Sequence, residues 1–267
     1  SAYLTFVAMG PNGKPQEIRY FSRQTDLPLT VGLLVDTSMS QRRLIDRQRR
    51  ASYQFFKQVL RPEQDMAFVV KFDTEVELLQ DLTNSRRLLE AALHLLMTPM
   101  AFSVPAPSPD PRMQQWPQPW PGGQRRPGGQ RRPGGQRPRG GGVGTALYDS
   151  VFLAADEVLH KQGGRKAIIL ISDGVDLGSK VTESRAIEAA QRTDTIVYSI
   201  HYYDPKAYPQ MRGPAGRGAN RDSSGAKTLT ALSTETGGRM FEVTDKLTLE
   251  SIYSEIQEEL RNQYSLG

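Results

Sequence analysis

Two short runs of almost uninterrupted apolar residues place the narrowest constraint on how this chain can fold. They are LTVGLLV at 29–35 and AIILIS at 167–172, and such runs are typical of strands buried on both faces of a sheet. Each is followed by a segment whose apolar residues recur at helical spacing. Strands that alternate with helices in this way predict a mainly parallel sheet with helices on both faces.

The same alternation continues along most of the chain. Further strands are expected at 66–72, 76–82, 195–200 and 239–243, and helices at 42–60, 85–96, 147–158, 186–191, 228–236 and 247–264. Asn84 is expected to cap the second of these helices. The turn at Asp73–Thr74 is too short for a crossover helix, so the strands on either side of it should be antiparallel neighbours. The predicted fold class is α/β: a Rossmann-like, doubly wound, mainly parallel sheet with one antiparallel edge strand.

Residues 1–26 stand apart from this pattern. Alternating apolar residues around Leu4 and Ala8 are separated by the turn sequence PNGKP from a second alternating pair, Ile18 and Tyr20. This arrangement predicts an N-terminal β-hairpin extension packed beside the main sheet. The main domain is expected to cover 27–267, and the polar segment 204–225 within it is interpreted as a surface loop.

A break in composition at 99–142 predicts a disordered insertion in the main domain. A Pro-rich stretch runs into PGGQRR at 121–126, the same six residues at 127–132, and PGGQRP at 133–138. Such a repeat has too little apolar surface to offset the entropy lost on ordering. Seven arginines against Asp110 give the window 101–142 a charge of +6; because the whole chain carries +5, the remainder sums to −1.

Two interpretations of the Arg-rich repeat stay open. As a polycation it could bind nucleic acid, anionic lipid or another anionic polymer such as a cell-wall polymer, and Trp116 and Trp120 could add stacking. Alternatively, it is a repeat expansion tolerated at a loop tip, because long loops add little to the entropy of loop closure.

The composition excludes several kinds of site. The chain has no cysteine, so disulfides, thiol nucleophiles and thiolate metal sites are ruled out. His94, His160 and His201 fall in three separate segments, which argues against a poly-histidine metal site. No run of 18 apolar residues exists, so no membrane-spanning helix is expected.

Oxygen-bearing side chains follow the expected strands where each strand ends. Asp36, Ser38 and Ser40 come directly after the first apolar run, Asp173 follows the AIILIS run, and Thr145 opens a helix after Gly144. In an open α/β sheet, ligands bind at the carboxyl ends of strands where the winding direction reverses. Carboxylates and hydroxyls without His or Cys are ligands suited to hard divalent cations, Mg²⁺ in particular.

These residues resemble a known site. Asp36, Ser38 and Ser40 in a D-x-S-x-S motif, with Thr145 and Asp173, are similar to the metal-ion-dependent adhesion site of von Willebrand factor type A domains. The resemblance extends from about residue 29 onward. The chain most resembles a bacterial subgroup of von Willebrand factor A-related proteins that is common in acidobacteria. The segments that carry this resemblance are LTVGLLVDTSMS, RPEQDMAFVVKFDTEVELLQDLT, GTALYDSVFLAADEV, GRKAIILISDGVD, TIVYSIHYYD, TGGRMFEV and IQEELRNQYSLG. The approach to Thr145 departs from the usual Gly-Gly-Thr and is GGGVGT here.

The resemblance implies a function as well as a fold. Ser38 and Ser40 would ligate Mg²⁺ (or Mn²⁺/Ca²⁺) directly, Asp36 and Asp173 would act mostly through metal-bound waters, and Thr145 would bind directly or through water. An Asp or Glu carboxylate of a protein partner would complete the coordination. Such a module is expected outside the cytoplasm, either periplasmic or secreted.

Structural interpretations of the same residues are also open. Asp36 could be a turn residue, and Ser38 or Ser40 could cap the helix at 42–60. Asp149 and Asp176 are interpreted as loop hydrogen-bonding residues, with Asp176 the better candidate to support a ligand.

An enzyme is not expected, because the chain has no nucleophile elbow, Walker loop or dinucleotide fingerprint. A hydrolase or phosphotransferase with Asp36 as nucleophile would usually need a second acid two residues later, where Ser38 stands.

Overall fold

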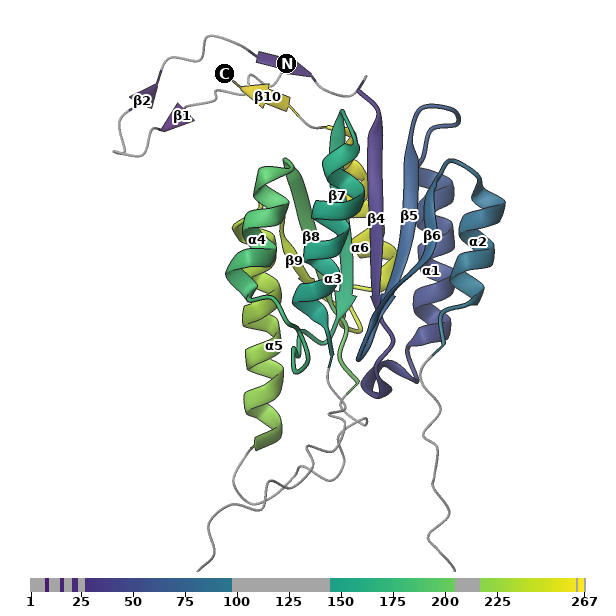
Figure 1. Cartoon of the computed structure of the whole chain (residues 1–267), viewed down its shortest axis with the longest axis vertical. Helices are drawn as coiled ribbons and strands as arrows, with labels where there is room; N and C mark the ends of the chain where they lie inside the picture. Colours follow the sequence, from purple (N-terminus) through teal and green to yellow (C-terminus); the bar gives the residue numbers. More distant parts are fainter. Residues whose placement is uncertain are drawn as a thin grey trace, which may run out of the picture.

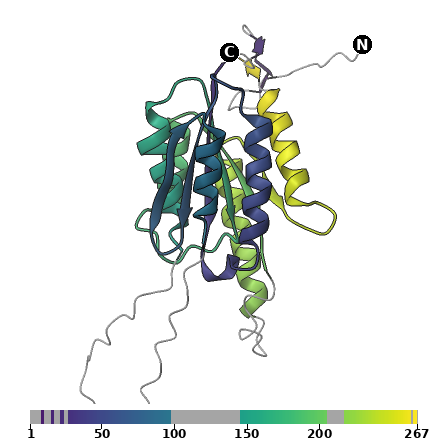
Figure 2. The ribbon, with the colours of Figure 1, turned by 90° about the vertical axis from the view of Figure 1, so that its right-hand side faces the viewer.

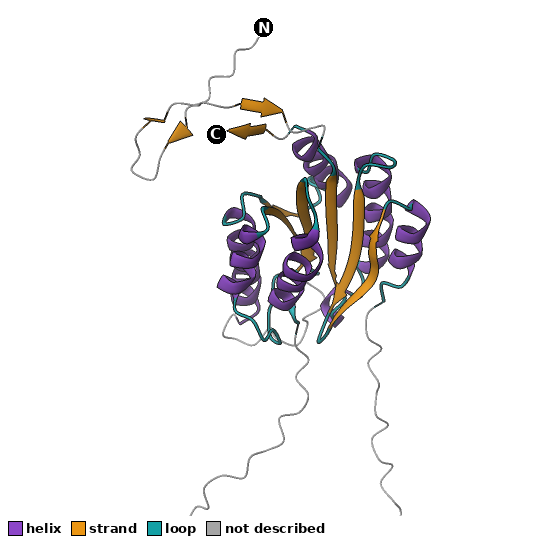
Figure 3. Cartoon of the chain, turned by 45° about the horizontal axis from the view of Figure 1, so that its top comes forward, coloured by secondary structure: helices purple, strands orange, loops and turns teal. Residues whose placement is uncertain are grey.

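A six-stranded sheet forms the centre of the protein in the computed structural model, which describes residues 8–9, 15–16, 21–23, 27–97, 145–204, 217–262 and 264–266. Its strands are β4 (Leu29–Asp36), β5 (Met66–Phe72), β6 (Val76–Thr83), β7 (Arg165–Ser172), β8 (Thr195–His201) and β9 (Met240–Glu242). The helices are α1 (Ile45–Val59), α2 (Arg86–His94), α3 (Leu147–Leu153), α4 (Glu183–Arg192), α5 (Arg217–Thr234) and α6 (Leu249–Arg261). Figure 3 shows the strands of the sheet side by side with helices around them.

The strand order is β6-β5-β4-β7-β8-β9. All neighbouring strands are parallel except β6, which is antiparallel to β5 at the edge. The predicted α/β class and the predicted antiparallel edge pair are therefore confirmed. From β4 the chain continues to β5 and β6 on one side, and later forms β7, β8 and β9 on the other. The winding direction therefore reverses between β4 and β7.

Alternate residues of the two central strands belong to two separate hydrophobic cores. Leu33 and Ile169 pack in the core under α1, α2 and α6, whereas Leu34 and Leu170 pack in the core under α3, α4 and α5. All four side chains are fully buried. Figure 2 shows α1 and α6 on one side of the sheet and α3 on the other. Burial on both faces explains why these two strand sequences are almost continuously apolar.

Helix α2 begins one residue later than predicted. Ser85 is its N-cap, and the Oγ of Ser85 accepts a hydrogen bond from the backbone N–H of Leu88 at 3.4 Å. The prediction that Asn84 is the cap is therefore wrong. Strand β6 continues to Thr83, whose Oγ1 accepts from the N–H of Ser85 at 3.1 Å, and this moves the start of the helix by one residue.

Helix α5 replaces the last nine residues of a predicted loop. A loop was expected at 204–225 and a short helix at 228–236, but α5 is one helix from Arg217 to Thr234. Leu229 and Leu232 in its second half are fully buried in the core. Their packing stabilises a helix whose first half has low intrinsic helix propensity, because four of its nine residues are Gly or Ser.

Short strands outside the main sheet pair the two ends of the described chain. Helix α6 was expected to reach residue 264, but it ends at Arg261, and β10 (Tyr264–Leu266) pairs antiparallel with β3 (Phe21–Arg23). A pairing between segments so far apart in sequence leaves no periodic signal in either. Figure 1 shows this pair beyond the amino end of β4, opposite the end of β4 at Asp36.

The structure describes part of the predicted N-terminal extension and none of the predicted insertion. Within the predicted hairpin extension 1–26, β1 (Ala8–Met9) pairs antiparallel with β2 (Pro15–Gln16). The predicted insertion 99–142 lies wholly outside the described residues. Among the helices that are described, none combines the length and the apolar character needed to span a bilayer.

Candidate functional site

The candidate site lies where the two central strands end, at the point where the winding direction reverses. Val35 on β4 pairs with Ile171 on β7, so the next residues, Asp36 and Ser172, are neighbours at the carboxyl edge of the sheet. The Oγ of Ser172 donates a hydrogen bond to Oδ2 of Asp36 at 2.6 Å, and both side chains are fully buried. Asp173 follows directly and is 2 % exposed. The fold therefore brings two carboxylates together from segments 137 positions apart.

Asp36 is held as a buried carboxyl group in an unfavourable electrostatic position. Its Oδ1 accepts a hydrogen bond from the N–H of Ser38 at 2.9 Å. Burial first, and then the charge of the nearby Asp173 carboxylate, raise the pKa of Asp36 from 3.8 to about 7, although the hydrogen bonds from Ser172 and Ser38 act in the opposite direction. A cation at this position would relieve the repulsion between the two carboxylates.

The hydroxyls of Ser38 and Ser40 lie 2.9 Å apart and cap no helix. Ser38 precedes a short 3₁₀ turn, Met39–Gln41, without a side-chain capping bond, and α1 follows Leu44. The capping interpretation of these serines is therefore not supported. In an octahedral Mg²⁺ shell with bonds of about 2.0–2.1 Å, adjacent oxygens lie about 2.9 Å apart. The two hydroxyls thus have the spacing of neighbouring ligands.

Thr145 reaches the same edge from the start of α3. It is 7 % exposed, and its carbonyl accepts hydrogen bonds from the N–H groups of Leu177 and Gly178, both at 3.1 Å. The N–H of the next residue, Ala146, donates to the carbonyl of Asp73 at 2.6 Å. Thr145 is thus tied both to the loop after Asp173 and to the end of β5. Gly144, which precedes it in the motif, lies outside the described residues.

Asp149 and Asp176 fasten the loop after β7 to the start of α3. Oδ1 of Asp176 accepts from the N–H of Leu147 at 2.9 Å and supplies the cap that α3 lacks locally. In return, Asp149 accepts from the N–H groups of Lys180 and Val181, each at 2.9 Å. Both residues are the loop hydrogen-bonding residues that were predicted, and Asp176 holds α3 behind Thr145.

Ser172 is a further member of the candidate site that the sequence analysis does not single out. Asp36 ends β4, and Ser172 ends β7 directly before the predicted Asp173. The hydrogen bond from Ser172 to Asp36 links the ends of the two strands. The signal was a single polar residue at the end of the apolar run AIILIS. Its role depends on the pairing register of β4 and β7, which the run alone does not specify.

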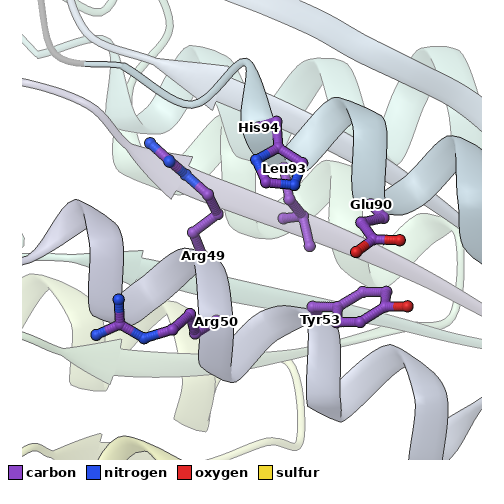
Figure 4. Close-up of a pocket in the computed structure, with 6 residues that line it drawn as sticks. All are labelled: Arg49, Arg50, Tyr53, Glu90, Leu93 and His94. Atoms are coloured by element: carbon purple, nitrogen blue, oxygen red, sulfur yellow. The ribbon is translucent and has the colours of Figure 1, made fainter.

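A separate pocket of about 110 Å³ lies between α1 and α2. Figure 4 shows the six lining residues, Arg49, Arg50, Tyr53, Glu90, Leu93 and His94, and none belongs to the candidate site. His94 is exposed at the end of α2, whereas His201 is buried at the end of β8. Within the described ranges, no three His, Asp or Glu side chains converge as ligands.

Comparison with known proteins supports the fold at low sequence identity. No protein-family model matches the sequence, and no curated protein matches it either. A von Willebrand factor type A protein from Catenulispora acidiphila is similar in structure, with a TM-score of 0.56, 13 % identity, and alignment over 88 % of this chain and 43 % of that one. The present chain therefore spans less than half of that protein.

Two further solved structures are matched over nearly their full length. An aerotolerance-related membrane protein from Bacteroides fragilis, with multiple mutations to serines, gives a TM-score of 0.54 at 14 % identity over 87 % of this chain and 98 % of that one. The von Willebrand factor domain of the type V pili tip protein Mfa5 from Porphyromonas gingivalis gives 0.55 at 12 % identity, over 87 % and 94 %.

Strand order, crossover pattern and structural matches together define a doubly wound α/β protein whose candidate site lies at the switch point. More specifically, the chain has the fold of a von Willebrand factor type A domain, as the sequence resemblance predicted.

Proposed function

We propose that this chain is a non-enzymatic, metal-dependent protein-binding module of the adhesion type. Mg²⁺ (or Mn²⁺/Ca²⁺) is held at Ser38, Ser40, Thr145, Asp36 and Asp173. An Asp or Glu carboxylate from a protein partner completes the coordination. When bound, the ion supplies a positive centre that an external carboxylate can reach.

The observation that carries this proposal is the buried Asp36 carboxylate beside the paired hydroxyls of Ser38 and Ser40. Asp36 faces Asp173 at an electrostatic cost that a divalent ion would offset. Neutral hydroxyls leave the charge of such an ion incompletely neutralised, so it attracts a further carboxylate. The donor set contains oxygen only, which favours hard cations over zinc.

The surroundings of Asp36 are poor for nucleophilic catalysis. Both of its oxygens already accept hydrogen bonds, one from the N–H of Ser38 and one from the hydroxyl of Ser172. An Asp36 nucleophile is therefore disfavoured, in agreement with a binding role.

An extracytoplasmic location, periplasmic or secreted, is part of the proposal. It is supported by the similarity in fold to a pilus tip protein and to a membrane protein. These likenesses are in fold, so the location is tested by fractionating cells that express the full gene product.

Calorimetric titration with Mn²⁺ and Mg²⁺ tests the metal site. The native chain should bind one ion, and Ser38→Ala and Ser40→Ala should each weaken binding by about 10-fold or more, because each removes a proposed ligand. Ser254→Ala is a matched control, since that exposed hydroxyl only donates to the carbonyl of Glu250. Equal affinity in the native chain and both site variants would refute the proposal.

The partner chemistry is tested with an array of short peptides in paired Glu and Gln versions. Binding in Mn²⁺ should favour the Glu version and disappear with EDTA. Signals that survive EDTA and are lost on adding salt would instead indicate simple charge attraction.

A further inference from the structure

Two glycines bring the backbone of α5 against the turn that carries Asp173. A Cβ built on Gly225 would lie 2.0 Å from the carbonyl oxygen of Asp173, and one on Gly174 would lie 2.2 Å from the carbonyl oxygen of Gly225. Real side chains do not approach backbone oxygens so closely. Because Gly174 also has a φ of +78°, its own conformation favours glycine. Gly225 has no such backbone requirement, so it is the close approach that calls for glycine there.

Helix α5 is fixed on the far side of this contact. Leu229, one turn after Gly225, and Leu232 are both fully buried in the core under α5. The Oγ of Ser233 accepts a hydrogen bond from the N–H of Ser199 on β8 at 3.1 Å. Figure 1 shows the first half of α5 extending past the carboxyl edge of the sheet. A side chain at 225 would therefore push on the Asp173 turn, because the second half of the helix cannot retreat.

The Asp173 turn is connected directly to the other carboxylate. The N–H of Gly174 donates to the Oγ of Ser172 at 2.9 Å, and that hydroxyl donates to Asp36 at 2.6 Å. The N–H of Val175 donates to Oδ1 of Asp173 at 3.1 Å and orients it. A displacement of Gly174 would thus disturb both carboxylates.

From this geometry we infer that Gly225 is a positioning residue for the site. Because Gly225 has no side chain, the backbone of α5 can pack directly against the Asp173 turn. This contact fixes the position of Asp173 and, through Ser172, that of Asp36. The inference rests on the proposed function, since the site that Gly225 positions is the proposed metal site. No motif around Gly225 indicates this role, because it arises from a contact between residues 51 positions apart.

The variant Gly225→Ala tests the inference by Mn²⁺ titration and by thermal unfolding without metal. Alanine within a helix normally stabilises it relative to glycine. Here we expect a lower thermal midpoint and Mn²⁺ affinity reduced by about 10- to 100-fold, as for other residues that orient ligands. Gly163→Ala is the matched control, since nothing lies within 4 Å of its added Cβ, and it should retain full affinity.

Each outcome separates the two proposals. Native Mn²⁺ affinity in Gly225→Ala, or a higher midpoint than the native chain, would overturn the positioning role. Failure of the variant to fold would also overturn it, because the contact would then serve the fold as a whole. If the native chain binds no metal, the proposed function fails, and the inference fails with it. In that case, a lower thermal midpoint of Gly225→Ala would show only that α5 and the Asp173 turn pack against each other.

Discussion

At the scale of single residues, Asp36 carries an electrostatic cost that links folding to pH. Its pKa is raised in the folded chain from 3.8 to about 7, first by burial and then by Asp173. Between these pH values the folded state binds more protons than the unfolded state, so stability falls as pH rises. The destabilisation is absent below about pH 4 and complete above about pH 7.

Replacing Asp36 with Asn should therefore stabilise the metal-free chain at pH 8. Asparagine is close in shape and keeps an oxygen that can accept from the N–H of Ser38, while the charge is gone. We expect the thermal midpoint to rise by roughly 5 °C at pH 8 and to change little at pH 4. The exposed Asp81→Asn is the control and should have no effect at either pH. A lower midpoint for Asp36→Asn at pH 8 would contradict the electrostatic account.

The site residues differ in how far sequence could predict them. Asp36, Ser38 and Ser40 occupy one short motif at the end of a recognisable strand, so the proximity of Asp36 to Asp173 follows from the rule that parallel strands end at one edge. Predicting the position of Ser172 beside Asp36 requires the pairing register of β4 and β7. Predicting the contact of Gly225 with the Asp173 turn requires the position of α5, whose local sequence resembles a loop.

At the scale of elements, α1 and α6 are joined by a buried hydrogen bond. The hydroxyls of Ser52 and Tyr253 lie 2.7 Å apart, and the Tyr253 ring stacks on Phe55 with ring centroids 4.6 Å apart. Both hydroxyl-bearing side chains are almost completely buried. Burial raises the pKa of Tyr253 well above its usual value, so the phenol stays protonated and available as a donor.

Single and double substitutions of this pair should give different costs. Ser52→Ala leaves a buried phenol without its partner and should reduce the free energy of unfolding by about 1–3 kcal/mol, whereas Tyr253→Phe should cost about 1 kcal/mol. The double variant should cost less than the sum of the two, because it leaves neither hydroxyl unsatisfied. Urea unfolding measures all three, and strict additivity would show that the hydroxyls do not interact.

Elements were predicted well where burial and periodicity agreed. The apolar runs of β4 and β7 and the stripe of α6 at Leu249, Ile252 and Ile256 correspond to fully buried side chains. The length of helix α5 is not predicted because its first half has low helix propensity, whereas the helix is stabilised by the packing of Leu229 and Leu232 in its second half. The β3–β10 pair was missed because strand pairing over such a separation has no local signature.

At the scale of the whole molecule, the described domain contains a complete sheet and two cores without any residue of 101–142. Replacing that segment with a short Gly/Ser linker should leave the thermal midpoint within a few degrees of the native value, because the replaced stretch is a polar repeat flanked by Pro-rich sequence. The substitution also removes a charge of +6 from a chain of +5. Loss of folding would show that the segment packs on the domain.

The position of β4 determines how the molecule would carry tension. The candidate site lies at one end of this strand, and the β3–β10 pair lies beyond the other end. A pull on a captured partner, resisted at the opposite end, would run along the axis of β4. Because β4 is paired in parallel with β5 on one side and β7 on the other, its hydrogen bonds lie across the pull and share the load in shear. An edge strand would instead be peeled away one bond at a time, so a site at the end of an inner strand such as β4 can withstand a larger pull than the same site on an edge strand.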